Sequence, residues 1–92
     1  MKKRPIQFDG FADAHGDLVA HFADGTRVHL HRGSGRSDLF YAMKPYSVHL
    51  DRSELPSVQR RYQRLALESF LCGRPAELVI DRDGDYRARL TG

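Results

Sequence analysis

Residues 18–31 read LVAHFADGTRVHLH, and this stretch decides the fold. Apolar and polar residues alternate on both sides of Ala23-Asp24-Gly25, which is typical of two antiparallel strands joined by a tight turn. A three-residue loop, a type I turn followed by glycine in the left-handed region, sets Leu18 opposite Leu30 and gathers the apolar side chains on one face. A two-residue turn would mix apolar and polar side chains on both faces, which is penalised wherever one face is buried. The pattern therefore predicts a hairpin with a three-residue loop.

This register assigns each side chain of the hairpin to one of two faces. The inward pairs are Phe22 with Thr26, Ala20 with Val28, and Leu18 with Leu30. The outer face carries five side chains, which are Val19, His21, Arg27, His29 and His31. We expect the inner face to pack on a core and the outer face, which is basic and rich in histidine, to meet solvent.

The same turn pattern recurs near the carboxyl end, at Arg82-Asp83-Gly84. A three-residue loop there directs three pairs inward: Ile80 with Tyr86, Leu78 with Ala88, and Ala76 with Leu90. The outward pairs are Glu77 with Arg89 and Val79 with Arg87, and the first of them is a favourable cross-strand charge contact. A second hairpin is therefore predicted to end the chain.

A third candidate turn, Ala14-His15-Gly16, predicts a strand before the central hairpin. A loop at 14–16 pairs Ala12 with Leu18, Gly10 with Ala20, and Phe8 with Phe22. Gly10 indicates a β-bulge, and Phe11 is then expected beside Val19 on the outer face. The predicted meander has three strands, at roughly 6–13, 17–22 and 26–32.

Between the two hairpins the sequence predicts a loop, a short strand and a helix. Residues 33–38 contain only turn formers and Arg36, so we expect a loop there. A short apolar piece at 39–43 follows, and the alternation of Tyr46, Val48 and Leu50 indicates the fourth strand. The helix is expected to begin with Asp51 or Ser53 as its cap and Pro56 in its first turn, and to stop at Gly73 before Pro75.

The predicted fold class is therefore α+β. A three-stranded meander, a fourth short strand and a C-terminal hairpin form one antiparallel sheet, which packs on one long helix. The 92 residues and 10.5 kDa suit one domain over residues 1–92.

A helical wheel divides the helix into a buried side and an outer stripe. The side expected to face the sheet comprises Leu55, Val58, Tyr62, Leu65, Ala66, Ser69 and Cys72. The outer stripe comprises Arg60, Arg64, Leu67, Phe70 and Leu71. Exposed leucines edged by arginines resemble the core and rim of a protein interface. The alternative is that residues 33–43 fold over this stripe and bury it.

Composition excludes several classes of protein. The one cysteine, Cys72, rules out an internal disulfide and a thiolate zinc site. No apolar run approaches the ~18 residues that a membrane span needs, so we expect a cytoplasmic protein that does not contact a membrane. No nucleophile, base and oxyanion donor group together, which indicates a protein that is not an enzyme and has no cofactor.

Two features of the sequence are typical of ligand sites, but each has a simpler structural interpretation. His29 and His31 share one side of a strand with His21 diagonal to them, but no carboxylate of the outer face is placed to orient a ring nitrogen, so no metal site is predicted. The loop Gly33-Ser34-Gly35-Arg36 has backbone N–H groups for a phosphate, but it lacks the P-loop pattern and is interpreted as a surface loop.

The cations suggest a nucleic-acid surface. The chain has fifteen Lys and Arg residues, twelve of them Arg, and twelve Asp and Glu residues, which gives a net charge of +3. Arginine makes planar, bidentate contacts with phosphate. The candidate nucleic-acid-binding residues are Arg27, Arg36, Arg87, Arg89, His29 and His31. Because Tyr86 points inward in this register, aromatic side chains for stacking bases are not expected on this face.

The chain is a short, cysteine-poor and charge-rich α+β domain without a catalytic motif. In these respects it resembles the small accessory proteins of phages and mobile elements, including the anti-CRISPR proteins. Anti-CRISPR proteins share no sequence motif, so the resemblance assigns no residue a role. It implies a protein that docks on a nucleic-acid-handling complex and occludes its working surface. The positive net charge departs from the acidic DNA mimics of that group and favours blocking by protein contact.

Three functions follow from these observations. The first is a non-enzymatic protein that docks on and inhibits or regulates a nucleoprotein complex through the outer helix stripe and the sheet arginines. The second is direct, sequence-tolerant binding of nucleic acid by the Arg and His face. The third is a homodimer formed through the exposed leucines or through an open sheet edge.

Overall fold

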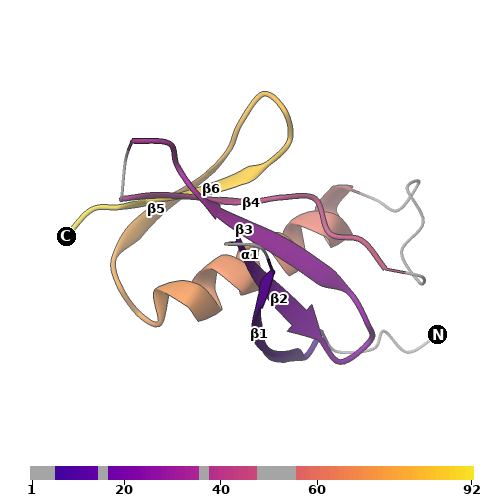
Figure 1. Ribbon diagram of the computed structural model, residues 1–92. Coiled ribbons are helices and arrows are strands. Elements are labelled where there is room, and N and C mark those ends of the chain that lie inside the picture. Colours follow the sequence, from indigo (N-terminus) through magenta and orange to yellow (C-terminus); the bar gives the residue numbers. More distant parts are fainter. Residues whose placement is uncertain (1–5, 15–16, 36–37, 48–55) are drawn as a thin grey trace.

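The computed structural model describes residues 6–14, 17–35, 38–47 and 56–92, and shows one six-stranded antiparallel sheet with one helix (Figure 1). The elements in chain order are β1 (Phe8–Ala14), β2 (Asp17–Phe22), β3 (Arg27–Arg32), β4 (Leu39–Ala42), α1 (Pro56–Leu71), β5 (Ala76–Ile80) and β6 (Tyr86–Leu90). The strand order across the sheet is β1-β2-β3-β4-β6-β5, so β1 and β5 are its open edges. The α+β fold predicted from the sequence is confirmed.

The register of the central hairpin is the predicted one. Leu18 lies opposite Leu30 and Ala20 opposite Val28, and the Phe22 N–H donates to the Thr26 carbonyl over 2.9 Å. Gly25 closes the loop at φ 91°, a conformation that a side chain would strain. The apolar side chains therefore share the face that packs on the helix.

The C-terminal hairpin also follows its predicted register. All five predicted cross-strand pairs of β5 and β6 are present, from Ala76 opposite Leu90 to Ile80 opposite Tyr86. The Asp81 side chain accepts the backbone N–H groups of Asp83 and Asp85, both over 3.0 Å, and so holds the turn. Turn chemistry therefore explains the acidic residues at this tip.

The first hairpin differs from its predicted register. Phe8 lies opposite Phe22 as expected, and a bulge between Phe8 and Gly10 is present, but beyond it Phe11 pairs with Ala20 and Ala12 with Val19. The bulge shifts the strand by one residue, so Phe11 joins the core face, where its ring lies 4.8 Å from Phe8 and 6.3 Å from Phe70. The expectation of Phe11 on the outer face was wrong.

The fourth strand is also displaced from its predicted position. β4 is the short apolar piece that precedes Pro45, and Tyr46 forms only an isolated bridge with Arg27. Val48 and Leu50 lie outside the described residues. Four residues are too few for alternation to show in a sequence, but here they pair on both sides, because β4 lies between β3 and β6 and joins the two hairpins into one sheet.

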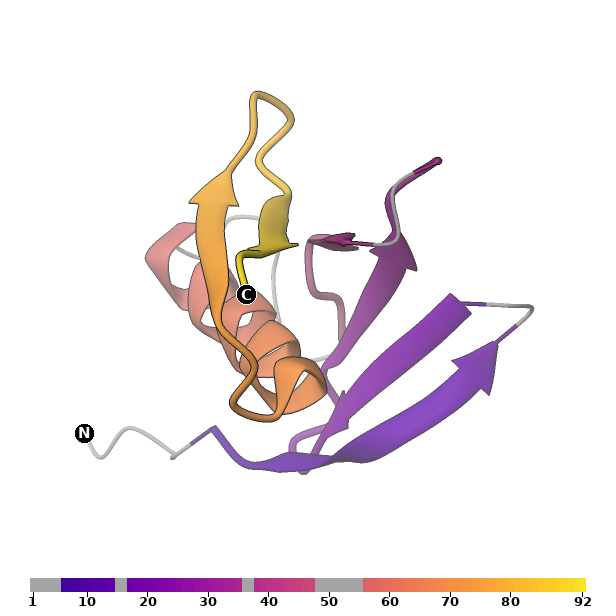
Figure 2. The same cartoon turned by 90° about the vertical axis from the view of Figure 1, so that its left-hand side faces the viewer.

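The helix packs across one face of the twisted sheet (Figures 1 and 2). It ends at Leu71, after which Cys72 and Gly73 have φ values of 52° and 88°. Its expected caps, Asp51 and Ser53, lie outside the described residues. The buried apolar residues that form the common core are Ala20, Phe22, Val28, Leu30, Phe40, Ala42, Tyr62, Ala66, Leu67, Leu71 and Ala88.

The buried face of the helix is rotated from the predicted one. Leu67 is 0% and Leu71 4% exposed, so their predicted exposure is wrong, and Cys72, expected in the core, is exposed. Gln63 explains the error, because this polar residue is 1% exposed and donates its Nε2 hydrogen to the Ala42 carbonyl over 2.9 Å. The helical wheel did not assign this polar residue to the buried side, and so it placed Leu67 and Leu71 on the outer stripe.

Among the described residues, no helix has the length and apolar character needed to cross a membrane.

Candidate functional site

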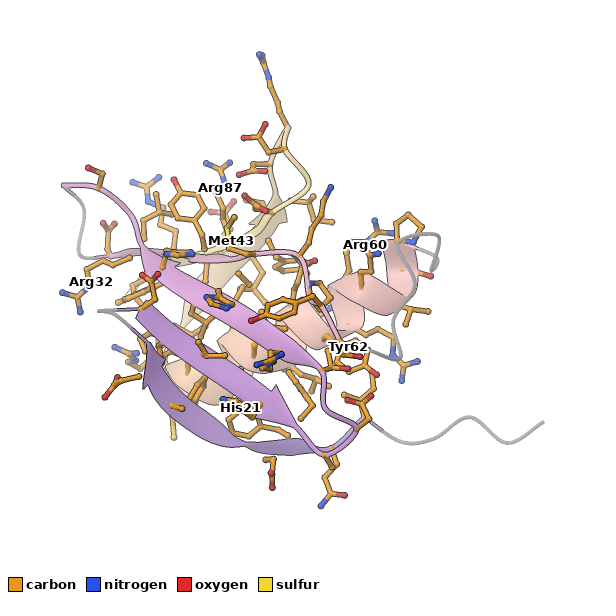
Figure 3. All side chains as sticks on the ribbon, turned by 45° about the vertical axis from the view of Figure 1, so that its right-hand side comes forward. His21, Arg32, Met43, Arg60, Tyr62 and Arg87 are labelled. Carbon is orange, nitrogen blue, oxygen red and sulfur yellow. The ribbon has the colours of Figure 1, made fainter. Side chains whose placement is uncertain are left out.

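The outer face of the sheet, which is the face away from the helix, brings the two basic hairpins together. Figure 3 looks onto this face, with His21 on β2 and Arg87 on β6. Through β4, His31 pairs with Tyr41, Tyr41 pairs with Arg87, and Arg87 pairs with Val79. A continuous row of side chains therefore crosses four strands, and we call its first three members, His31, Tyr41 and Arg87, the cross-strand row.

Tyr41 has a position that the sequence interpretation did not assign. Its neighbours Phe40 and Ala42 are buried against the helix, so the half-buried Tyr41 side chain belongs to the outer face. The sequence interpretation expected no aromatic side chain for stacking bases on this face, and Tyr41 places an aromatic ring there. No alternation within residues 39–42 announces this position, which follows only once that piece is known to be a strand.

A second group of side chains lies beside the row and is built around Tyr46. The Arg27 guanidinium lies 4.8 Å from the centre of the Tyr46 ring, and the Tyr46 hydroxyl is 2.9 Å from His29 Nε2. Tyr46 is 44% exposed. The bridge fixes its place, because Arg27 and Tyr46 exchange backbone hydrogen bonds of 3.0 and 3.1 Å. We call Arg27, His29 and Tyr46 the Tyr46 cluster.

The arginines of this face differ in how far they are neutralised. Arg89 lies opposite Glu77, and its Nε is 3.7 Å from the Asp38 carboxylate. Within the described part of the chain, neither Arg27 nor Arg87 forms an ion pair. Of the described arginines on this face, Arg27 and Arg87 therefore have charge available to an anion.

Arg87 also lines a pocket on this face. The pocket has a volume of about 290 Å³, and its lining residues are Leu39, Glu77, Val79, Arg87 and Arg89. The Nε atom of Arg87 is buried without a hydrogen-bond partner among the described residues. A buried guanidinium donor is costly to leave unpaired, which favours an acceptor from outside the chain.

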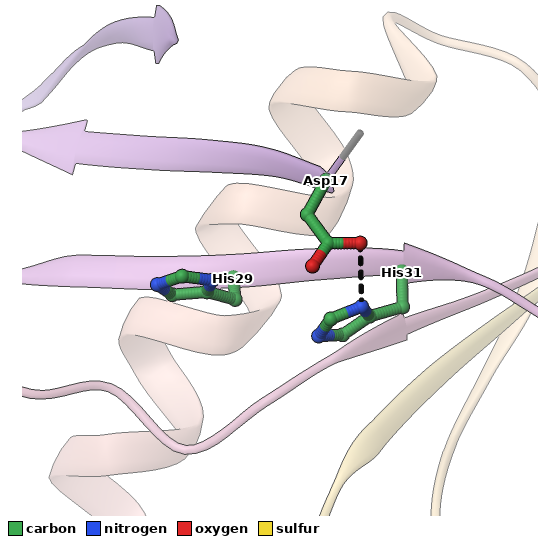
Figure 4. Close-up of side chains that lie close together, drawn as sticks. All are labelled: Asp17, His29 and His31. Carbon is green, nitrogen blue, oxygen red and sulfur yellow. Dashed lines mark hydrogen bonds and ion pairs between the residues drawn. The ribbon is translucent and has the colours of Figure 1, made fainter. Parts of the chain in front are cut away.

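Asp17 contributes a carboxylate to the histidine side of the face. Its Oδ1 is 2.9 Å from Nδ1 of His31, and Figure 4 shows its carboxylate lying beside both His31 and His29. The expectation that no carboxylate of this face reaches a histidine was wrong. Asp17 begins β2, where the register sets it against the end of β3.

The outer helix stripe does not form the predicted surface. Leu67 and Leu71 lie in the core, and Phe70 is half-buried, with its ring 4.8 Å from that of Phe40. Residues 33–43 were the candidate to cover this stripe, and of these, residues 39–42 lie against the helix as strand β4 of the sheet. Arg60 is half-buried, and Arg64 is exposed and paired with Glu68 over 2.9 Å. Arg36, the remaining candidate site residue, lies outside the described residues.

Comparisons of the chain with protein-family models, with curated proteins and with solved structures gave no match.

Proposed function

We propose that this protein binds single-stranded nucleic acid, without strong sequence preference, on the outer face of its sheet. The observation that supports this most is the cross-strand row, in which Tyr41 lies between His31 and Arg87 on three adjacent strands. The resemblance to accessory proteins of phages agrees with a nucleic-acid-handling role but assigns no residue to it.

The chemistry of the face suits an unpaired strand. A base stacks on an aromatic ring with about 1–3 kcal/mol, whatever its identity, and a neighbouring arginine contacts the phosphate of the same strand. Tyr41 and Tyr46 supply rings, and Arg87 and Arg27 supply guanidinium groups beside them. A strand that runs across the sheet would therefore meet alternating stacking and charged positions.

This function is preferred to docking on a nucleoprotein complex through the helix. That hypothesis required Leu67 and Leu71 on the surface, and both are buried. The arginines it shared with nucleic-acid binding, Arg87 and Arg89, remain on the outer face. The structure therefore leaves the sheet face exposed for binding, whereas the leucines of the helix stripe are buried.

The test is binding of a fluorescently labelled oligouridylate and an oligothymidylate, followed by anisotropy, with wild-type protein and a Tyr41→Ala variant. We expect binding of either strand and a loss of about five- to 150-fold in affinity for Tyr41→Ala, since one stacked base contributes ~1–3 kcal/mol. Tyr41→Phe, which keeps the ring, should bind like wild type. Circular dichroism of each variant checks that the sheet is intact.

Charge is tested separately by the dependence of affinity on salt. Replacing Arg87 by Ala should reduce the slope of log affinity against log salt by about 0.7, the value for one phosphate contact on a single strand. The matched control is Arg61→Ala, which removes an exposed arginine from the helix on the opposite face. If neither strand binds, or if Arg61→Ala weakens binding as much as Arg87→Ala, the sheet face is not the site and the proposal is wrong.

A further inference from the structure

We propose that Asp17, His29 and His31 bind a zinc ion on the outer face of the sheet. One ligand atom from each of the three side chains lies within 4.8 Å of the other two, and His31 Nδ1 is 2.9 Å from Asp17 Oδ1. The residues come from β2 and β3, whose paired backbones hold them in register. The site shares His29 and His31 with the proposed nucleic-acid face, but it is inferred from the geometry of its ligands and does not rest on the proposed function.

The ligand set and its dimensions suit Zn²⁺. Two imidazole nitrogens and a carboxylate oxygen are its ordinary ligands, at about 2.0–2.2 Å, which places tetrahedral ligand atoms roughly 3.3 Å apart. The pair His31 and Asp17 is already near that separation, and His29 needs to approach by at most about 1.5 Å, which is within the reach of side-chain rotation. Three protein ligands leave a fourth position for water.

Tyr46 supplies the outer partner that the sequence interpretation found missing. Its hydroxyl lies 2.9 Å from Nε2 of His29. In the tautomer of His29 that carries its hydrogen on Nε2, this hydrogen is donated to Tyr46 and the lone pair of Nδ1 is left for the ion. Histidines that bind a metal usually donate their other N–H in this way, which fixes the tautomer and the ring. The backbone bridge to Arg27 holds Tyr46 in place.

The site is open to an ion from solution. The side chains of His31 and Asp17 are 36% and 39% exposed, so an ion reaches them without a change in the core. An exposed ion pair between these two residues would itself contribute only about 0–1 kcal/mol. Breaking the contact between His31 and Asp17 therefore costs little free energy compared with what two metal–ligand bonds contribute.

The experiment is calorimetric titration of ZnCl₂ into the full chain prepared without a histidine tag, and absorbance of the Co²⁺ form. We expect one ion per chain with a Kd in the micromolar range or tighter, and visible Co²⁺ bands of a four-coordinate site. Asp17→Asn and His31→Gln should each weaken Zn²⁺ binding at least tenfold. Tyr46→Phe should weaken it by about 10- to 100-fold through His29. Mg²⁺ and Ca²⁺, which prefer oxygen ligands, should not compete.

The matched control is His21→Gln, which removes a histidine of the same sheet that is not among the three ligands. This variant should bind Zn²⁺ like wild type. Absence of heat and of Co²⁺ bands at micromolar protein would overturn the proposal. Unchanged affinity in both Asp17→Asn and His31→Gln would overturn it as well, with circular dichroism confirming that each variant is folded. Nucleic-acid binding enters none of these readouts.

Discussion

At the scale of single residues, Tyr62 links the helix to the turn of the central hairpin. Its hydroxyl donates to Oδ2 of Asp24 over 2.6 Å, and Oδ1 of the same carboxylate accepts the Thr26 N–H over 2.8 Å. The pKa of Tyr62 is raised above its ordinary value of 10.0, first by burial and then by the hydrogen bond to Asp24. The folded protein therefore favours the neutral phenol.

Tyr62→Phe tests this contact. The variant should lose about 1.5–3 kcal/mol of unfolding free energy at neutral pH, the range for a hydrogen bond to a charged group. Because the folded pKa is raised, the stabilisation from Tyr62 is fully present below about pH 10 and is lost as the pH rises further. Urea denaturation between about pH 9 and pH 11 measures it. Equal pH dependence in wild type and Tyr62→Phe would contradict this account.

Single residues also explain which side chains sequence reasoning placed correctly. Gly25 and Gly84 close turns at positive φ, and a glycine after two ordinary residues is a local signal that a sequence displays. Gln63 and Tyr41 have no such local signal, and the sequence interpretation assigned neither a position. Burial of Gln63 depends on the Ala42 carbonyl, and the position of Tyr41 between His31 and Arg87 depends on pairing with β3 and with the distant β6.

At the scale of elements, the helix face that carries Leu67 decides against docking through the helix. Leu67 has no exposed surface, and the helix lies against strands on both sides of β4. Leu67 and Leu71 therefore hold the helix on the sheet and are unavailable to a partner.

Leu67→Ala should lower the unfolding free energy by about 2–5 kcal/mol, since it leaves a cavity in the core. Arg64→Ala, one turn earlier and exposed, should change it by less than about 1 kcal/mol. Chemical denaturation of the two variants gives both values. Similar small effects in both would mean that Leu67 faces solvent.

Two hairpin registers could be derived from the sequence, because in each the apolar pattern of about fifteen residues fits only one loop length. The register of β1 could not, because a bulge adds one residue without changing the local composition. The position of β4 was missed since its pairing with β3 and β6 is set by the rest of the sheet.

At the scale of the whole molecule, the two faces of the sheet carry different kinds of side chain. One face is filled by the helix, and the other gathers aromatic, histidine and arginine side chains from β2 to β6. The sequence supplied the basic residues of this outer face, but their adjacency exists only once β4 joins the hairpins. A homodimer through the open edges of β1 or β5 stays a prediction, which analytical ultracentrifugation would test.

The measurement that tests the central claim most directly is amide chemical-shift mapping of the protein during titration with an oligouridylate of about ten nucleotides. The account predicts shifts concentrated around His31, Tyr41 and Arg87, with Arg61, Arg64 and Glu68 on the opposite face unchanged. Shifts confined to the helix, or none at concentrations where the strand is bound by known single-strand binders, would contradict it.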